Sequence, residues 1–170
     1  GTPINLAILC IHLARAQGWS AEGIAIPGHF VCRLEASGER IIFDPFNRAK
    51  ALNASDLRSL VKQTLGQEAE LEYKHYSAIE NRSILLKLQN NIKQQQKQLK
   101  NFRAALAAVN TMQQIAPEEP RFLYDAGLLY ARANQAKTAI TILSRYVKKS
   151  KSSYRKNSAN RVLRLLMQQR

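Results

Sequence analysis

A histidine and an aspartate are the residues of this chain best placed to do chemistry together. His29 opens one predicted strand and Asp44 ends the next. A hairpin centred on Ser37 and Gly38 pairs Val31 with Asp44, and it makes His29 and Asp44 diagonal neighbours on one face, with Cβ atoms about 7 Å apart or less. A carboxylate beside an imidazole fixes its tautomer and raises its basicity. The two residues are therefore a candidate acid–base dyad.

The chain offers no obvious nucleophile for this dyad. Cys32 is predicted on the opposite face from His29, and Cys10 lies two turns inside an apolar helix, where no base would activate its thiol. Neither cysteine has a C-x-x-C or Cys/His metal spacing, so we expect no metal site and no cofactor. The hydroxyl of Thr2, at a helix start, is committed to capping. The default compartment for such cysteine usage is reducing and cytoplasmic.

The first half of the chain has the pattern of a small α+β fold. A helix begins at Thr2-Pro3 and runs to about Gln17, and we expect it to be mostly buried, with a stripe of Leu6, Leu9, Cys10 and Leu13. A helix this apolar needs cover on most sides, which leads us to expect a further segment upstream. Strands are predicted at 21–26, 29–35, 40–44 and 70–75, and a helix at 53–65. They form a small antiparallel sheet with a buried helix and one covering helix, in a domain at residues 1–78.

The second half predicts only helices, at 80–98, 101–115, 119–133, 135–149 and 155–169. One apolar face recurs 34 residues later, because Ala105-Leu106, Val109 and Met112 are matched by Ala139-Ile140, Leu143 and Tyr146. A helix–turn–helix period of 34 is typical of tetratricopeptide repeats. We therefore predict an all-α repeat domain at residues 79–170, closed by a capping helix whose apolar face is Val162, Leu165 and Leu166.

Charge is distributed very unevenly between the two halves. Residues 1–80 carry eight basic and nine acidic side chains, whereas residues 81–170 carry eighteen and three. Such asymmetry favours an acidic partner for the second half. We expect an acidic protein segment to dock on the concave face of the repeats, through Lys93, Lys97, Arg103, Arg132 and Lys137. Nucleic acid is an alternative, although no sequence-specific binding motif is present. No run of 18 apolar residues occurs, so no membrane span is expected.

Three sequence segments together resemble a known bacterial family. They are Gly1-Thr2-Pro3-Ile4-Asn5-Leu6-Ala7, Pro27-Gly28-His29-Phe30 and Asp44-Pro45-Phe46. With the downstream repeats, they are similar to the SirB family, which is described as a transglutaminase-like core followed by tetratricopeptide repeats. The resemblance implies the Cys-His-Asp triad of active superfamily members, with His29 and Asp44 matching the histidine and aspartate. The cysteine position falls at the helix start, where Pro3 or its neighbour stands instead.

The missing cysteine leads us to expect a non-catalytic protein, with His29 and Asp44 as a relic dyad. Its role would be that of a protein-interaction or adaptor module. One alternative is a cysteine-type hydrolase or acyltransferase that uses His29 and Asp44 with a nucleophile outside this chain. A second alternative is a basic RNA- or ribosome-associated protein.

Overall fold

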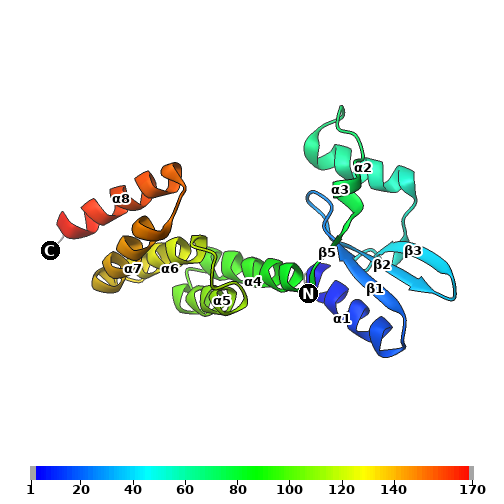
Figure 1. Cartoon of the computed structure of the whole chain (residues 1–170), viewed down its shortest axis with the longest axis horizontal. Coiled ribbons are helices and arrows are strands. Elements are labelled where there is room, and N and C mark those ends of the chain that lie inside the picture. Colours follow the sequence, from blue (N-terminus) through cyan, green and yellow to red (C-terminus); the bar gives the residue numbers. More distant parts are fainter. Residues whose placement is uncertain (1–2, 169–170) are drawn as a thin grey trace. The chain divides into compact units, whose positions relative to one another are not determined.

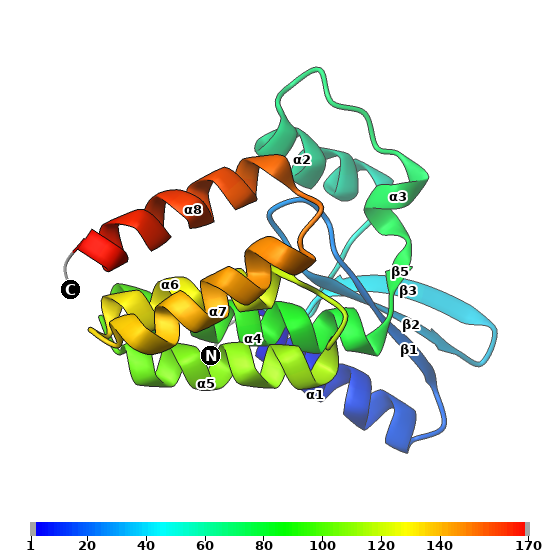
Figure 2. The same ribbon diagram turned by 60° about the vertical axis from the view of Figure 1, so that its left-hand side comes forward.

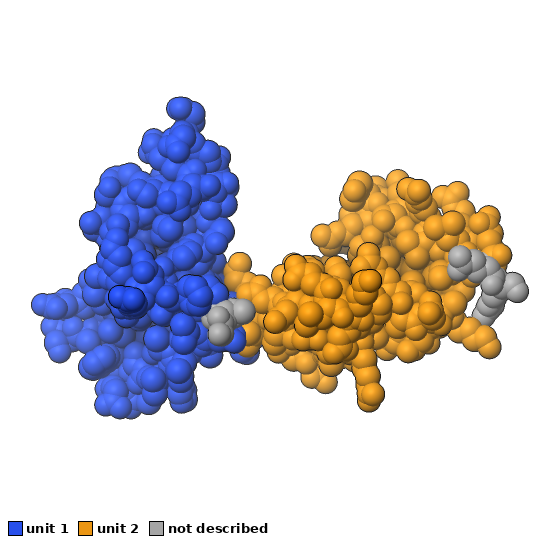
Figure 3. Space-filling model, turned by 180° about the vertical axis from the view of Figure 1, so that it is seen from behind, with its two compact units in different colours: residues 1–85 blue, residues 86–170 orange. Residues whose placement is uncertain are grey.

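The computed structural model describes residues 3–168 (Figure 1). The chain forms two compact units, Gly1–Leu85 and Leu86–Arg170 (Figure 3). The division falls inside one helix, whereas the domains expected from the sequence meet at residues 78 and 79. The first turn of that helix belongs with the first unit, because a Cβ placed on Gly23 of the sheet would lie 2.8 Å from Ile84 Cδ1.

The first unit combines a five-stranded antiparallel sheet with three helices, which confirms the α+β class. The strand order is β4-β3-β2-β1-β5. Along the chain the elements are α1 (Pro3–Ala16), β1 (Ser20–Ile24), β2 (Val31–Ala36), β3 (Glu39–Asp44), β4 (Lys50–Ala51), α2 (Ala54–Leu65), α3 (Tyr73–Tyr76) and β5 (Ala78–Ile79).

The β2–β3 hairpin has the register expected from the sequence. Cys32 pairs with Phe43, and Ala36 pairs with Glu39 at the turn. Ser37 and Gly38 both have positive φ, 52° and 83°, as a two-residue turn that matches the twist of its strands requires. This turn fixes which residues of the two strands lie opposite one another.

Helices cover both faces of the sheet (Figures 1 and 2). Val31 of β2 packs with Leu57 and Val61 of α2. The next residue, Cys32, lies 3.8 Å from the carbonyl oxygen of Ala7 in α1. Because neighbouring residues of a strand point to opposite faces, α1 and α2 lie on opposite sides of the sheet.

The expected burial of α1 is wrong. Ile4, Ala7 and Ile11 are its buried residues, whereas the side chains of the leucine stripe, Leu6, Leu9 and Leu13, are 37%, 51% and 55% exposed. The sheet covers only one side of the helix. The small side chain of Ala7 lets the backbone of α1 approach β2 closely, which turns the leucines away.

The strand predicted at residues 70–75 is also wrong. Residues Tyr73–Tyr76 form the short helix α3, and the backbone N–H of Glu72 donates to Nδ1 of the buried His75 at 3.1 Å. Pairing with β1 begins later, where Ala78 lies opposite Ile24. The local side-chain bond of His75 competes here with strand formation.

The second unit is helical, with α4 (Asn81–Gln98) shared across the boundary and followed by α5 (Phe102–Ile115), α6 (Arg121–Arg132), α7 (Ala136–Lys149) and α8 (Ser153–Gln168). These bounds agree with the five predicted helices to within two residues. No helix in the described part of the chain is long and apolar enough to cross a membrane.

The period of 34 in the sequence is also a period of the structure. Lys100 and Asn134, the turn residues ahead of α5 and α7, both have left-handed backbone conformations, with φ of 55° and 57°. Val109 and Leu143 are both completely buried. Equivalent positions therefore have equivalent conformations and environments in the two helix pairs.

Helix α8 closes the stack against α7. Ala159 and Leu163 join the buried cluster of Leu143 and Tyr146, with Val162 and Leu166 packed beside it. Leu165, expected on the same face, is 53% exposed instead.

Gly127 allows α6 and α7 to pack closely, and this contact generates a stability prediction. A Cβ on Gly127 would lie 2.6 Å from Cγ and Cδ2 of the fully buried Leu143. We expect Gly127→Ala to destabilise the second unit by about 1–3 kcal/mol, because overpacking outweighs the helix propensity gained. Urea unfolding followed by far-ultraviolet circular dichroism measures the loss.

The fluorescence of Trp19, the single tryptophan, reports on the first unit and serves as an internal control. In a Leu143→Ala background the same glycine substitution should no longer destabilise the helices. A stabilising Gly127→Ala in the native background would contradict the close contact.

Candidate functional site

A tight turn positions His29 directly ahead of β2. Gly28 has a φ of 73°, and a Cβ at this residue would lie 2.5 Å from Oγ1 of Thr64 in α2. The backbone N–H of His29 donates to the carbonyl oxygen of Ile26 at 2.9 Å. Both the conformation and the space around residue 28 therefore require glycine, and the imidazole is held by a rigid piece of main chain.

Asp44, the last residue of β3, meets that imidazole. Its Oδ2 lies 2.8 Å from Nε2 of His29. Its Oδ1 accepts hydrogen bonds from the backbone N–H groups of Phe46 at 2.9 Å and Asn47 at 3.2 Å. The carboxylate is buried, and the three donors replace the water that it loses. The two N–H groups are not evident from the sequence, although an aspartate before a proline is a common start of a turn.

The contact determines which nitrogen of His29 is free for chemistry. An ionised carboxylate only accepts hydrogen bonds, so a neutral imidazole paired with it carries its proton on Nε2 and keeps the lone pair on Nδ1. The His29 side chain is 26% exposed, and no described residue forms a hydrogen bond with Nδ1. Nδ1 is therefore placed to accept a proton from a nucleophile that lies next to the ring.

Neither cysteine supplies that group within the described residues. Burial, with smaller contributions from Cys10 and Asp44, raises the pKa of the Cys32 thiol to about 12. Its sulfur faces the Ala7 carbonyl rather than the imidazole. Cys10 is half-buried, one turn beyond Ala7, and forms no hydrogen bond with His29.

The helix start that matches the cysteine position holds no sulfur. Pro3 is the first residue of α1, and a pyrrolidine ring carries no nucleophilic atom. Thr2, the hydroxyl weighed from the sequence, lies outside the described residues. Among residues 3–168, no group of three His, Cys, Asp or Glu side chains is arranged to hold a metal ion.

Of the residues expected to bind a partner, Lys93 has another role. It is 6% exposed, and its Nζ forms an ion pair with Asp125 of α6. Position 93 lies 34 residues before Gly127, and its ammonium reaches across from α4 to a carboxylate of α6. Lys93 therefore joins the two helices and is not presented to a partner.

The other four basic residues gather at one edge of the helical stack. Lys97 and Arg132 are near the ends of α4 and α6, and Arg103 and Lys137 are in the first turns of α5 and α7. Helix α6 packs against both α5 and α7, and short loops connect the three helices. Neighbouring helices are therefore antiparallel, and these helix ends lie along the same side of the stack. We call Lys97, Arg103, Arg132 and Lys137 the turn edge.

The hydrogen bonds of Asp44 predict that replacing Asp44 lowers the free energy of unfolding more than replacing His29. Asp44→Ala removes the acceptor of two backbone N–H groups and of the imidazole, and should lower the free energy of unfolding by about 2–3 kcal/mol. His29→Ala removes one donor at a partly exposed position, where water can reach Oδ2 of Asp44 in place of the ring, and should lower the free energy of unfolding by only about 1 kcal/mol. Denaturant unfolding followed by Trp19 fluorescence compares the two variants. Equal costs would contradict a mainly structural role for the carboxylate.

The raised pKa of Cys32 predicts a thiol that is unreactive in the folded protein. With a pKa of about 12, the thiolate is a fraction on the order of 10⁻⁴ at pH 8. In a Cys10→Ser variant, alkylation of Cys32 by iodoacetamide should await unfolding and should speed up strongly in denaturant. The wild-type chain provides the control for the half-buried Cys10. Rapid alkylation of native Cys32 would contradict the burial.

Comparison with known proteins agrees with this geometry. The family model of the transglutaminase-like superfamily matches residues 1–90. A UPF0162 protein of Xylella fastidiosa is 30% identical over 151 residues, which cover 86% of this chain and 53% of the relative. SirB1 of Salmonella typhimurium is 25% identical over 148 residues, covering 86% and 55%. A UPF0162 protein of Vibrio cholerae is 25% identical over 142 residues, covering 83% and 52%.

The chain spans about half the length of the curated relatives it matches. No solved structure matches it. The family model covers the sheet and both residues of the dyad, and the relatives extend the similarity into the helical unit. The chain therefore belongs to the transglutaminase-like superfamily and, within it, to the SirB family.

Proposed function

We propose that this chain is a non-catalytic transglutaminase-like domain joined to tetratricopeptide repeats, and that it works as a protein-interaction module. The observation that carries the proposal is the chemistry around His29. An acid–base dyad accelerates acyl transfer only if a nucleophile is activated beside it. The thiol nearest in sequence has a pKa of about 12, and the helix start carries proline.

The bonding of the dyad also suits a structural role. Asp44 holds the turn after β3 through two N–H groups and holds the turn before β2 through His29. A dyad of this kind fixes two neighbouring loops whether or not it takes part in a reaction. We infer that it has been retained for this purpose.

The helical unit supports the interaction role. A stack of helix pairs with a regular period presents extended surfaces suited to binding. The repeated turn conformations at Lys100 and Asn134, and the repeated burial at Val109 and Leu143, are what tetratricopeptide repeats would require.

Electrostatics favour an acidic partner at the turn edge. Arg103 and Lys137 lie in the first turns of α5 and α7, where the helix dipole is already positive. Within the described residues, neither of them forms an ion pair with a carboxylate of the chain. Positive charge is concentrated there at some cost in helix stability, and an acidic protein surface in the cytoplasm would neutralise it.

The proposal predicts that charge reversal at the turn edge weakens capture of an acidic partner. We expect Arg103→Glu with Lys137→Glu to lower the amount of partner recovered from a bacterial lysate by about tenfold, since repulsion replaces attraction. The matched control is Arg161→Glu with Arg164→Glu, which changes the net charge equally on the exposed side of α8. Quantitative mass spectrometry of the captured proteins measures the difference.

Three results would contradict the proposal. Equal losses in both variants, or recovery that nuclease treatment abolishes, would point to non-specific charge or to nucleic acid. Hydrolysis of amide or ester substrates that His29→Ala eliminates would point instead to an enzyme that takes its nucleophile from outside this chain.

A further inference from the structure

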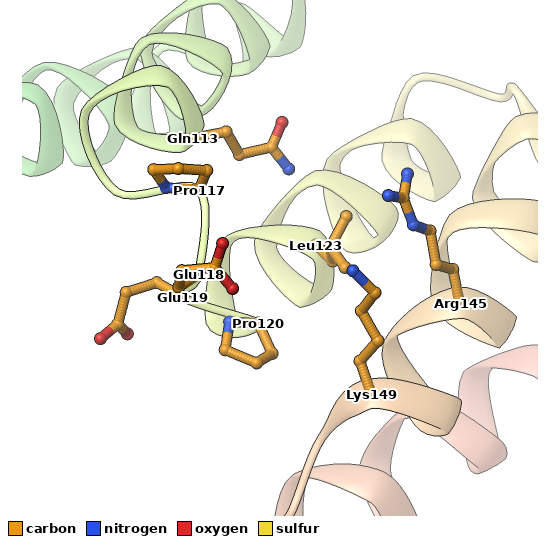
Figure 4. Close-up of a pocket in the computed structure, with 8 residues that line it drawn as sticks. All are labelled: Gln113, Pro117, Glu118, Glu119, Pro120, Leu123, Arg145 and Lys149. Atoms are coloured by element: carbon orange, nitrogen blue, oxygen red, sulfur yellow. The ribbon is translucent and has the colours of Figure 1, made fainter.

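A groove of about 350 Å³ opens in the second unit between the α5–α6 loop and the last two turns of α7 (Figure 4). Such a volume lies at the lower end of ligand-binding sites, which run from about 300 to 1,000 Å³. It is large enough for a few side chains of a peptide, and it lies wholly within one compact unit.

One wall of the groove is positively charged. Arg145 and Lys149 are exposed residues of α7, four positions apart and therefore on the same side of the helix. Their spacing along the helix axis is about 6 Å. In the described chain neither side chain forms an ion pair. Figure 4 shows Lys149 reaching across toward Leu123, with Arg145 beside it.

The opposite wall is apolar with hydrogen-bond acceptors at its rim. Leu123 of α6 is half-buried and forms the apolar surface. Gln113 and Glu118 contribute an amide and a carboxylate, and Glu118 has no ion-pair partner among the described residues. Glu119 extends away from the groove and pairs with Arg121 at 3.2 Å.

We propose that this groove binds an extended acidic peptide segment of a partner protein. Side chains two positions apart in an extended chain lie on the same side, about 7 Å from one another. Two such carboxylates match the spacing of Arg145 and Lys149. The side chain between them points the other way, onto Leu123, so the preferred pattern is acidic–apolar–acidic.

Glu118 favours a peptide over a nucleic acid. A peptide backbone carries N–H groups that can donate hydrogen bonds to Glu118 and Gln113. A phosphate backbone presents only acceptors and negative charge. Glu118 repels every phosphate of a nucleic acid, whereas a peptide can turn its N–H groups toward Glu118 and its carboxylates toward Arg145 and Lys149.

The groove is separate from the turn edge. Lys137 lies in the first turn of α7 and Lys149 ends the helix, about 18 Å away along the axis. The inference rests on the proposed role as an interaction module, yet a partner held only at the turn edge would leave the groove empty. The two surfaces are therefore tested by different variants.

A titration followed by two-dimensional amide NMR tests the inference on the full chain. The probe is a short capped peptide with an Asp-Leu-Asp core, added to millimolar concentration, and the matched probe has Asn-Leu-Asn. We expect saturable shifts at Leu123, Arg145 and Lys149 with the acidic peptide, and an affinity at least about tenfold lower in Arg145→Glu with Lys149→Glu. Arg161→Glu with Arg164→Glu should change the affinity less than about threefold.

Each other outcome would overturn the inference. These are shifts that spread over all basic residues, equal losses in both double variants, equal binding of the amide peptide, and displacement of the peptide by oligothymidine. Absence of shifts at the groove would remove this site, while loss of capture by the turn-edge variant would still support the proposed function.

Discussion

The buried carboxylate of Asp44 is the constraint on which the first unit depends. It is 5% exposed, and its two oxygens accept from two backbone N–H groups and from an imidazole. A carboxylate removed from water is tolerable only when donors surround it in this way. The end of β3, the turn after it and the turn before β2 are therefore fixed together, and the orientation of His29 follows from the same bonds.

That arrangement gives His29 and Asp44 the geometry of an acid–base pair. A neutral imidazole that donates from Nε2 to the carboxylate has the lone pair of Nδ1 available, as a general base needs. The sulfur of Cys32, on β2, is on the side covered by α1, where burial keeps it protonated. Positions next to one another in a strand face opposite ways, so proximity in sequence to His29 gives Cys32 no access to it.

Charge has a comparable role in the second unit. Only three acidic residues lie in its sequence range, and two of them are already engaged, Asp125 by Lys93 and Glu119 by Arg121. Most of the cations therefore have no internal counter-charge. Four of them form the turn edge, and two others, Arg145 and Lys149, line the groove beside the last turns of α7.

Local patterns in the sequence determined much of this architecture. The positions of the helices, the register of the β2–β3 hairpin and the period of 34 follow from turn residues and apolar spacing, which act over a few neighbouring residues. The juxtaposition of His29 and Asp44 also follows from the hairpin, because an antiparallel register fixes which residues meet.

Tertiary packing decided the rest, because it depends on which side of an element finds a neighbour. The leucines of α1 have the spacing of a buried stripe, yet the side of the helix that is buried carries Ile4, Ala7 and Ile11. Lys93 has the charge of a typical surface residue, yet it is buried and its ammonium pairs with Asp125 of α6. The groove between Leu123 and Lys149 is lined by residues of three helices and a loop. The distances between these side chains depend on how the helices pack, which no local sequence pattern determines.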